Sequence, residues 1–257
     1  MIISIKDYLT TKDISGNIIL YRDNQHKKKE LCEYIAKNVS TNKTICCSSG
    51  GAYGLYLAKA FPNNNIVICG SPSAEYKKQI DRLSNVTIKT TIRETSPEST
   101  NIKDYAEQQG YYHISQYTDP LIEEYYKIHF ADILKELEGV NIDAFCDCGH
   151  SCATLSGFIA ADLVKWAFIL GVVRPEGIRT WVHHLSDKTD KFVQETTRNF
   201  DTKQIQLDIE EMYPDFGNVF EATRSISAAM SWLLKNPGKT VLVYVGDSPV
   251  FGEDAII

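Results

Sequence analysis

Long apolar runs, a secretory leader and a surplus of positive charge are all missing from this chain. No hydrophobic stretch reaches the roughly 20 residues that a membrane-spanning helix needs. The opening residues, MIISIKDYLTTKD, lack the apolar core of a secretion signal. Lys and Arg number 27 against 33 Asp and Glu, for a net charge of −6, so neither nucleic acid nor an anionic membrane is expected as the main partner.

Paired cysteines are missing as well. The seven cysteines are an odd number, and two of them, Cys46 and Cys47, are adjacent, which argues against a disulfide framework. We therefore expect a reducing, cytoplasmic location. The 257 residues include 43% hydrophobic and 23% charged side chains, a balance that is ordinary for a soluble globular protein with a sizeable core.

What the chain does contain is a regular alternation of strand-like and helix-like segments. Short apolar runs predict strands, and longer segments with apolar residues at helical spacing predict helices between them. This rhythm predicts an α/β fold with mostly parallel sheets flanked by helices. The predicted strands are residues 17–21, 44–47, 65–69, 86–92, 142–146 and 241–245. The predicted helices are residues 29–37, 54–61, 74–83, 125–137, 158–170 and 225–234, and the polar segment 188–214 is expected to be surface elaboration.

The segment ICCSSGGAYGLYLA places Ser48, Ser49, Gly50 and Gly51 between a buried strand and a helix. Such a loop presents backbone N–H groups and the positive end of the helix dipole, and glycine lets a ligand approach the backbone closely. It is therefore suited to an anion such as a carboxylate. A tight turn that only packs the helix against the strand is the alternative interpretation.

Two later loops have the same design. DCGHSCATLSG follows the strand predicted at residues 142–146, and Gly246-Asp247-Ser248-Pro249 follows the strand at 241–245. Ligands in α/β sheets collect at the carboxyl ends of strands. The three loops are therefore expected to converge on one ligand.

The order of these pieces resembles the fold type II pyridoxal-phosphate enzymes, the tryptophan synthase β superfamily, and within it the cysteine synthase and cystathionine β-synthase branch. SSGGAYGLYLAKAF is similar to the SSGGNAGLA or TSGNTG loop of that family. SQYTDP is similar to the start of NQFxNPxNPxxHY, IDAFCDCGHSCATLSGF to VDAFVAGIGTGGTITGV, and VLVYVGDSPVFGEDAI to VVLPDSGERYLS.

The resemblance implies a role for each matching position. Ser48, Ser49, Gly50, Gly51 and Gln116 would bind the substrate carboxylate. Ala52 would lie beside the cofactor ring, and Ser248 would meet the pyridine nitrogen. The cofactor phosphate would be held by Gly149, His150, Ser151, Cys152, Ala153 and Thr154. Lys27, or alternatively Lys28, would attach pyridoxal phosphate covalently.

The implied activity is a pyridoxal-phosphate-dependent β-elimination or β-replacement on a serine, O-acylserine or cysteine-type amino acid. The implied organisation is a homodimer whose subunit has an N-terminal subdomain, residues 1–138, and a C-terminal subdomain, residues 139–257. The first would carry the lysine and the carboxylate loop, and the second the phosphate loop and Ser248.

Several positions depart from the family pattern. The NPTGS part of the lysine motif NPTGSxKDR is missing, and the family's asparagine is replaced by Ala52. His150, Cys152 and Ala153 replace glycines, and their β-carbons would crowd a phosphate. These departures leave open a catalytically inactive relative that binds an amino acid or a partner subunit.

A metal-dependent enzyme is a third interpretation. Cys146, Cys148, His150 and Cys152 are all of ligand type and recur at every second position. However, that spacing places them on one side of a short extended strand, which cannot surround a metal tetrahedrally. Small side chains beside a phosphate-type loop, or a thiol activated by the helix N-terminus, explain the same residues.

Overall fold

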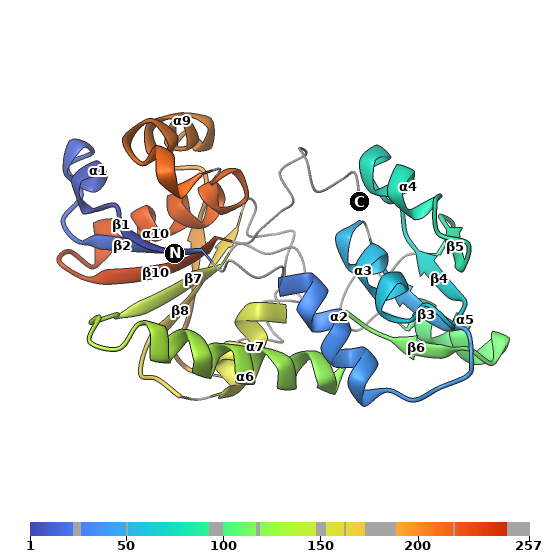
Figure 1. Cartoon of the computed structure of the whole chain (residues 1–257). Helices are drawn as coiled ribbons and strands as arrows, with labels where there is room; N and C mark the ends of the chain where they lie inside the picture. The colour runs from blue at the N-terminus through green and yellow to red at the C-terminus, as the bar shows by residue number, and fades with distance from the viewer. Residues whose placement is uncertain are drawn as a thin grey trace. The chain divides into compact units, whose positions relative to one another are not determined.

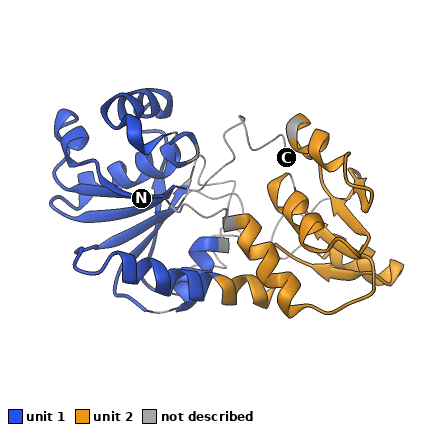
Figure 2. Ribbon diagram, viewed as in Figure 1, with its two compact units in different colours: residues 1–25, 126–254 blue, residues 26–125, 255–257 orange. Residues whose placement is uncertain are grey.

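The computed structural model describes residues 1–22, 27–49, 51–92, 100–116, 119–147, 153–161, 163–172, 189–217 and 219–245. The chain divides into two compact units, coloured separately in Figure 2. Unit 1 comprises Met1–Gln25 and Tyr126–Asp254, and unit 2 comprises His26–Tyr125 and Ala255–Ile257. The predicted assignment of roles to residues 1–138 and 139–257 stays a prediction.

Unit 1 is built on a six-stranded sheet in the order β1-β2-β10-β7-β8-β9 (Figure 1). Only the β1–β2 pair is antiparallel. Its strands are β1 (Ile2–Ser4), β2 (Asn17–Arg22), β7 (Ala144–Asp147), β8 (Ala167–Val172), β9 (Phe192–Thr196) and β10 (Thr240–Val245). Its helices are α1 (Lys6–Thr11), the greater part of α6 (Pro120–Glu136), α7 (Ala153–Ala161), α9 (Thr202–Met212), η2 (Pro214–Phe216), η3 (Phe220–Ala222) and α10 (Thr223–Lys235).

Both faces of the unit 1 sheet are covered. Apolar residues of α1, α9 and α10 pack on one face, which includes Cys146 of β7. On the other face Phe145 of β7 contacts Phe158 of α7, which stacks on Phe130 of α6 with ring centroids 4.1 Å apart. Successive strand residues point to opposite faces, so the apolar run of β7 serves both layers.

Unit 2 has a four-stranded, fully parallel sheet in the order β5-β4-β3-β6. Apolar residues of α5 pack on the face that carries Cys46 and Cys69. Its strands are β3 (Ile45–Ser48), β4 (Ile66–Cys69), β5 (Val86–Lys89) and β6 (Tyr112–Ile114). Its helices are α2 (Lys27–Asn38), α3 (Ala52–Ala60), α4 (Ala74–Ile80) and α5 (Asn101–Gln109), and the first residues of α6 also belong to it.

Two sequence predictions were wrong. Residues 158–170 do not form one helix, because α7 ends at Ala161 and Ala167–Val172 is strand β8. β8 lies between two parallel strands and is apolar on both faces, and periodicity does not distinguish such a run from a buried helix. The segment 188–214 is not only surface elaboration, since it contains edge strand β9 and amphipathic helix α9.

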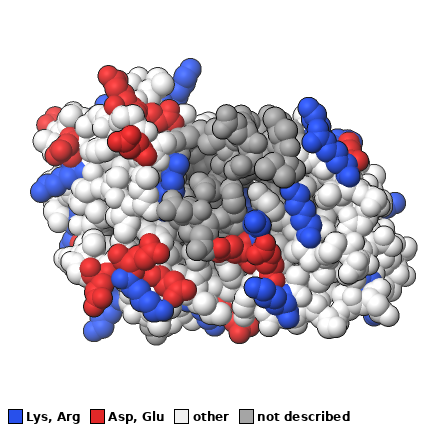
Figure 3. All heavy atoms as spheres, viewed as in Figure 1, with Lys and Arg blue, Asp and Glu red and all other residues white. Residues whose placement is uncertain are grey.

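No helix within the described ranges is both long and apolar enough to cross a membrane. On the face drawn in Figure 3, Lys and Arg side chains occur as separate groups among acidic ones.

Candidate functional site

The loop after β3 is organised by the hydroxyl of Ser49, which is 2% exposed. Its Oγ accepts hydrogen bonds from the backbone N–H groups of Gly51, at 3.1 Å, and Gly54, at 2.9 Å. It also lies 3.3 Å from the Gly51 carbonyl oxygen, to which it donates. Ser49 therefore satisfies N–H groups at the start of α3 that have no partner within the helix.

Glycines let this loop pack closely. A β-carbon on Gly51 would lie 2.5 Å from the Tyr76 ring, and one on Gly54 would lie 2.8 Å from Ile68 and 3.0 Å from the Ser49 side chain. On the neighbouring strand end, the Ser49 amide donates to the Cys69 carbonyl at 3.1 Å. The loop of small residues is thus held by contacts on both sides. The predicted Gly50 lies outside the described residues.

Gln116 reaches the same edge of the sheet as Ser49. Strands β3 and β6 are parallel neighbours, with Cys47 in register with Ile114. Ser49 and Gln116 each follow two positions later, and Ser48 follows directly after Cys47. The structure therefore brings Ser48, Ser49 and Gln116 to the carboxyl end of one sheet. This is the position expected for residues that share a ligand.

The segment after Gln116 is fixed by Asp119. Its carboxylate accepts a hydrogen bond from the Leu121 amide at 3.0 Å in the first turn of α6, and its amide donates to the Ser115 carbonyl at 3.3 Å. Burial raises the pKa of the Asp119 carboxyl, whereas the Leu121 hydrogen bond lowers it, and the net direction is upward.

Helix α2 begins at Lys27, the predicted cofactor lysine, whose side chain lies outside the described part of the structure. Lys28, the alternative, is exposed. Helix α2 is anchored to α3, since the buried Cys32 thiol donates to the Tyr53 carbonyl at 3.7 Å. Burial is the main cause that raises the pKa of the Cys32 thiol well above its usual value. The thiol is therefore neutral and contributes to packing between the two helices.

Ala52 is the first residue of α3 and is 7% exposed. Its methyl group stands where the family pattern has a hydrogen-bonding amide. The position is therefore buried but offers a ligand only backbone groups.

In unit 1, strands β7, β10 and β2 lead to the other predicted loops. β10 lies between β7 and β2 and is parallel to both, with Val243 opposite Cys146 and Val245 opposite Arg22. The loops that follow these three strands therefore leave from one edge of the sheet. Gly149, His150, Ser151, Cys152 and Ser248 lie outside the described residues, as does the side chain of Ala153. Thr154 is buried in the first turn of α7.

Cys146, the first residue of the suggested metal cluster, is fully buried, and its thiol donates to the Ser225 carbonyl at 3.3 Å. This contact places it in the core beneath α10. Among the residues that the structure describes, no group of three or more His, Cys, Asp or Glu side chains is suited to a metal. Cys148, His150 and Cys152 lie outside that set, so the metal site stays a prediction.

Arg22 also lies at this edge of the sheet, and the sequence analysis did not single it out. It ends β2 at the edge just described, and its guanidinium lies over the Phe216 ring at 4.8 Å from the centroid. It was overlooked because RDNQHKKK reads as a uniform polar segment. The predicted strand ends at Tyr21, and this end indicated that the next residue lies at the edge of the sheet.

Replacing Ser49 by alanine should destabilise unit 2 by about 1–2 kcal/mol, because the Gly51 and Gly54 N–H groups would lose a buried acceptor. Thermal unfolding followed by circular dichroism would measure the loss. Ser73→Ala is the matched control, because Ser73 precedes α4 but makes no capping hydrogen bond with its side chain. Equal melting temperatures for the two variants would contradict the assignment.

No protein-family model and no curated protein matches the sequence. Solved structures do match. The O-acetylserine-dependent cystathionine β-synthase from Helicobacter pylori is 13% identical with a TM-score of 0.73, covering 98% of this chain and 94% of that one. An O-ureido-L-serine-bound variant of O-ureido-L-serine synthase is 14% identical with a TM-score of 0.67, covering 93% and 89%. A hydrogen sulfide-producing enzyme from Fusobacterium nucleatum is 13% identical with a TM-score of 0.65, covering 91% and 89%.

At these identities the likeness establishes the fold. The predicted α/β fold with parallel sheets flanked by helices is confirmed, and the chain shares the fold of these solved structures. The expected homodimer and cytoplasmic location stay predictions.

Proposed function

We propose that this chain is a pyridoxal-phosphate-dependent enzyme that catalyses β-elimination or β-replacement on a serine, O-acylserine or cysteine-type amino acid. The observation that carries the proposal is the placement of Ser48, Ser49 and Gln116 at one strand edge beside the start of α3. The solved structures that share the fold support it, because their names specify serine derivatives or hydrogen sulfide.

Unit 2 would bind the substrate carboxylate. The N-terminus of α3 supplies partial positive charge, and the Ser48 hydroxyl and the Gln116 amide are neutral donors with adjustable direction. In this structure the Ser49 hydroxyl occupies N–H groups of the same helix end. These hydrogen bonds hold the loop in its conformation before a carboxylate arrives, which reduces the entropy lost on binding.

Unit 1 would bind the cofactor. Thr154 is buried in the first turn of α7, and a hydroxyl with helix N–H groups suits a phosphate. Strand β10 runs parallel to β7 and ends at the same edge of the sheet, and this placement supports a cofactor site at that edge. We assign the phosphate to residues 149–154 and the pyridine nitrogen to Ser248. When bound, pyridoxal phosphate supplies an electron sink for charge at the substrate Cα.

We assign covalent retention of the cofactor, and movement of the proton at the substrate Cα, to the ε-amine of Lys27. A lysine suited to both tasks needs a lowered pKa, which burial and neighbouring cations provide. Lys28 is exposed, so it lacks that burial. Lys27 stays the first candidate and Lys28 the alternative, in the order that the resemblance to the family's lysine motif gave.

A catalytically inactive relative is the second candidate, and Ala52 favours it. That residue is buried at the start of α3, where the family pattern has an asparagine. A protein that only binds an amino acid or a partner subunit needs the carboxylate loop but not this amide. Such a protein would keep the hydrogen bonds of Ser49 and lose the cofactor.

Titration of the purified protein with pyridoxal phosphate would separate the two. We expect a visible absorbance band that borohydride reduces, followed by release of product from O-acetyl-L-serine when sulfide is supplied. A protein that stays colourless with the cofactor, yet gives a calorimetric binding signal with L-serine, would replace the proposal by the second candidate.

A further inference from the structure

Unit 2 contains a pair of buried thiols that the proposed reaction does not use. The Sγ atoms of Cys46 in β3 and Cys69 in β4 lie 3.6 Å apart, and both residues are fully buried. They point to the sheet face covered by α5, where they pack with Val67, Ile102 and Ala106. Cys47, the next residue along the chain, points to the opposite face.

The surroundings of the pair include a base and a phenol. His113 of β6 is in register with Cys46 and therefore lies on the same face, and burial, first of all, lowers the pKa of its imidazole. The imidazole Nε2 is buried and has no hydrogen-bond partner among the described residues. Tyr105 of α5 packs against the cluster that contains both cysteines. Burial is the main cause that raises the pKa of its phenol, followed by Tyr111, Cys69 and Cys46.

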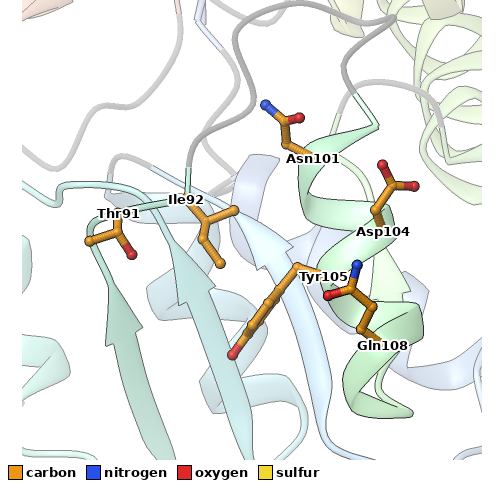
Figure 4. A pocket seen from close by; sticks show the side chains of 6 residues that line it. All are labelled: Thr91, Ile92, Asn101, Asp104, Tyr105 and Gln108. Atoms are coloured by element: carbon orange, nitrogen blue, oxygen red, sulfur yellow. The ribbon is translucent and has the colours of Figure 1, made fainter.

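Tyr105 also lines an open hollow at the surface (Figure 4). The hollow has a volume of about 380 Å³ and lies between the end of β5 and helix α5. Its lining residues are Thr91, Ile92, Asn101, Asp104, Tyr105 and Gln108. The Tyr105 side chain therefore contacts both the hollow and the buried cluster that contains Cys46 and Cys69.

We propose that Cys46 and Cys69 form a reversible disulfide when the protein meets a peroxide. One sulfur attacks the O–O bond and takes one oxygen as a sulfenic acid, and the other oxygen leaves as water. The second sulfur then displaces the sulfenic oxygen as a second water, which closes the S–S bond. In sum the two thiols lose two protons and two electrons, and one hydrogen peroxide becomes two waters.

Formation of the Cys46–Cys69 disulfide would act on residues 48–51, the loop predicted to bind the substrate carboxylate. The S–S distance must shrink from 3.6 Å to about 2.05 Å, which draws Cys46 near the start of β3 toward Cys69 at the end of β4. The Cys69 carbonyl accepts the hydrogen bond of the Ser49 amide, and Cys69 is in register with Ser48. Oxidation would therefore shift the predicted substrate-binding residues Ser48 and Ser49, a consequence that rests on the proposed function.

The test treats the reduced, purified full chain with hydrogen peroxide and locates crosslinks by mass spectrometry of peptides kept unreduced. We expect a Cys46–Cys69 link that dithiothreitol reverses. Cys46→Ala and Cys69→Ala should each abolish it, and Cys47→Ala, a buried neighbour on the other face, should keep it. The crosslinked peptides are identified in the wild-type protein, so the test can be completed even if one of the variants fails to fold.

Absence of the Cys46–Cys69 link in the oxidised wild type would overturn the proposal, whichever other cysteines crosslink. Calorimetry with O-acetyl-L-serine is a second readout, for which we expect about tenfold weaker binding after oxidation. A mapped link without any substrate binding would refute the proposed function and leave the thiol chemistry standing. A mapped link with unchanged substrate affinity would refute the coupling between the pair and the loop.

Discussion

Lys27→Ala is expected to abolish turnover of O-acetyl-L-serine, with a loss on the order of 10³-fold or more, and to remove the borohydride-sensitive absorbance band. Under the proposed function the ε-amine of Lys27 would both retain the cofactor and move the proton at Cα, so its removal would end both tasks. Stopped assays of product formation and absorbance titration with pyridoxal phosphate would measure the two effects. The melting temperature should change little, because only one side chain at the first position of α2 is shortened.

Lys28→Ala and Lys29→Ala are the matched controls. Both side chains are exposed, and Lys29 makes only a distant ion pair with Glu33, at 4.0 Å. Each variant should keep the absorbance band and most of the activity. If Lys28→Ala removed both while Lys27→Ala kept them, the lysine assignment would pass to Lys28. If neither variant changed the spectrum, the cofactor would not be held through this segment at all.

The sequence was most informative where a short apolar run ends in small residues. The runs at residues 44–47, 65–69 and 241–245 all correspond to buried strands. Buried parallel strands are apolar on both faces, so a short apolar run that is bounded by turn residues indicates one. The loops that follow them could be located for the same reason, because a run of serine and glycine after such a strand interrupts the pattern sharply.

The same pattern did not identify β8 and β9, because in these two segments the local sequence does not indicate a strand and the neighbouring strands determine the structure. The run from Ala167 continues the apolar character of α7, and only its place beside β7 makes it a strand. β9 pairs only with β8 and is largely half-buried, so its residues show weak alternation. Edge strands of this kind depend on their neighbours more than on their own sequence.

The candidate site shows the limit of sequence reasoning more clearly. Ser49 could be identified as a hydroxyl in an anion-binding type of loop, but whether it faces a ligand or its own helix depends on the hydrogen bonds to Gly51 and Gly54. Likewise, the placement of Gln116 beside Ser49 depends on the pairing of β3 with β6. Sheet order is a property of the whole unit, and no local motif encodes it.

Gly70→Ala is expected to destabilise unit 2 by about 2–4 kcal/mol and to lower its melting temperature by about 5–10 °C. Gly70 has φ +149°, and a β-carbon there would lie 2.4 Å from the Ser49 carbonyl oxygen. Backbone, unlike a flexible side chain, cannot move aside cheaply. The Gly70 amide also donates to the Lys89 carbonyl at 2.9 Å, so the residue ties β5 to the same strand edge.

Gly110→Ala provides the comparison that isolates this contact. Gly110 ends α5 in the same unit with φ +69°, and a β-carbon there meets nothing within 4 Å. Replacing it by alanine should therefore lower the free energy of unfolding only by the strain of the left-handed backbone conformation, about 1 kcal/mol. Because the clash at Gly70 falls on Ser49, Gly70→Ala should also weaken calorimetric binding of L-serine, whereas Gly110→Ala should leave that binding unchanged. Equal losses of stability and equal affinities in the two variants would show that Gly70 does not support the carboxylate loop.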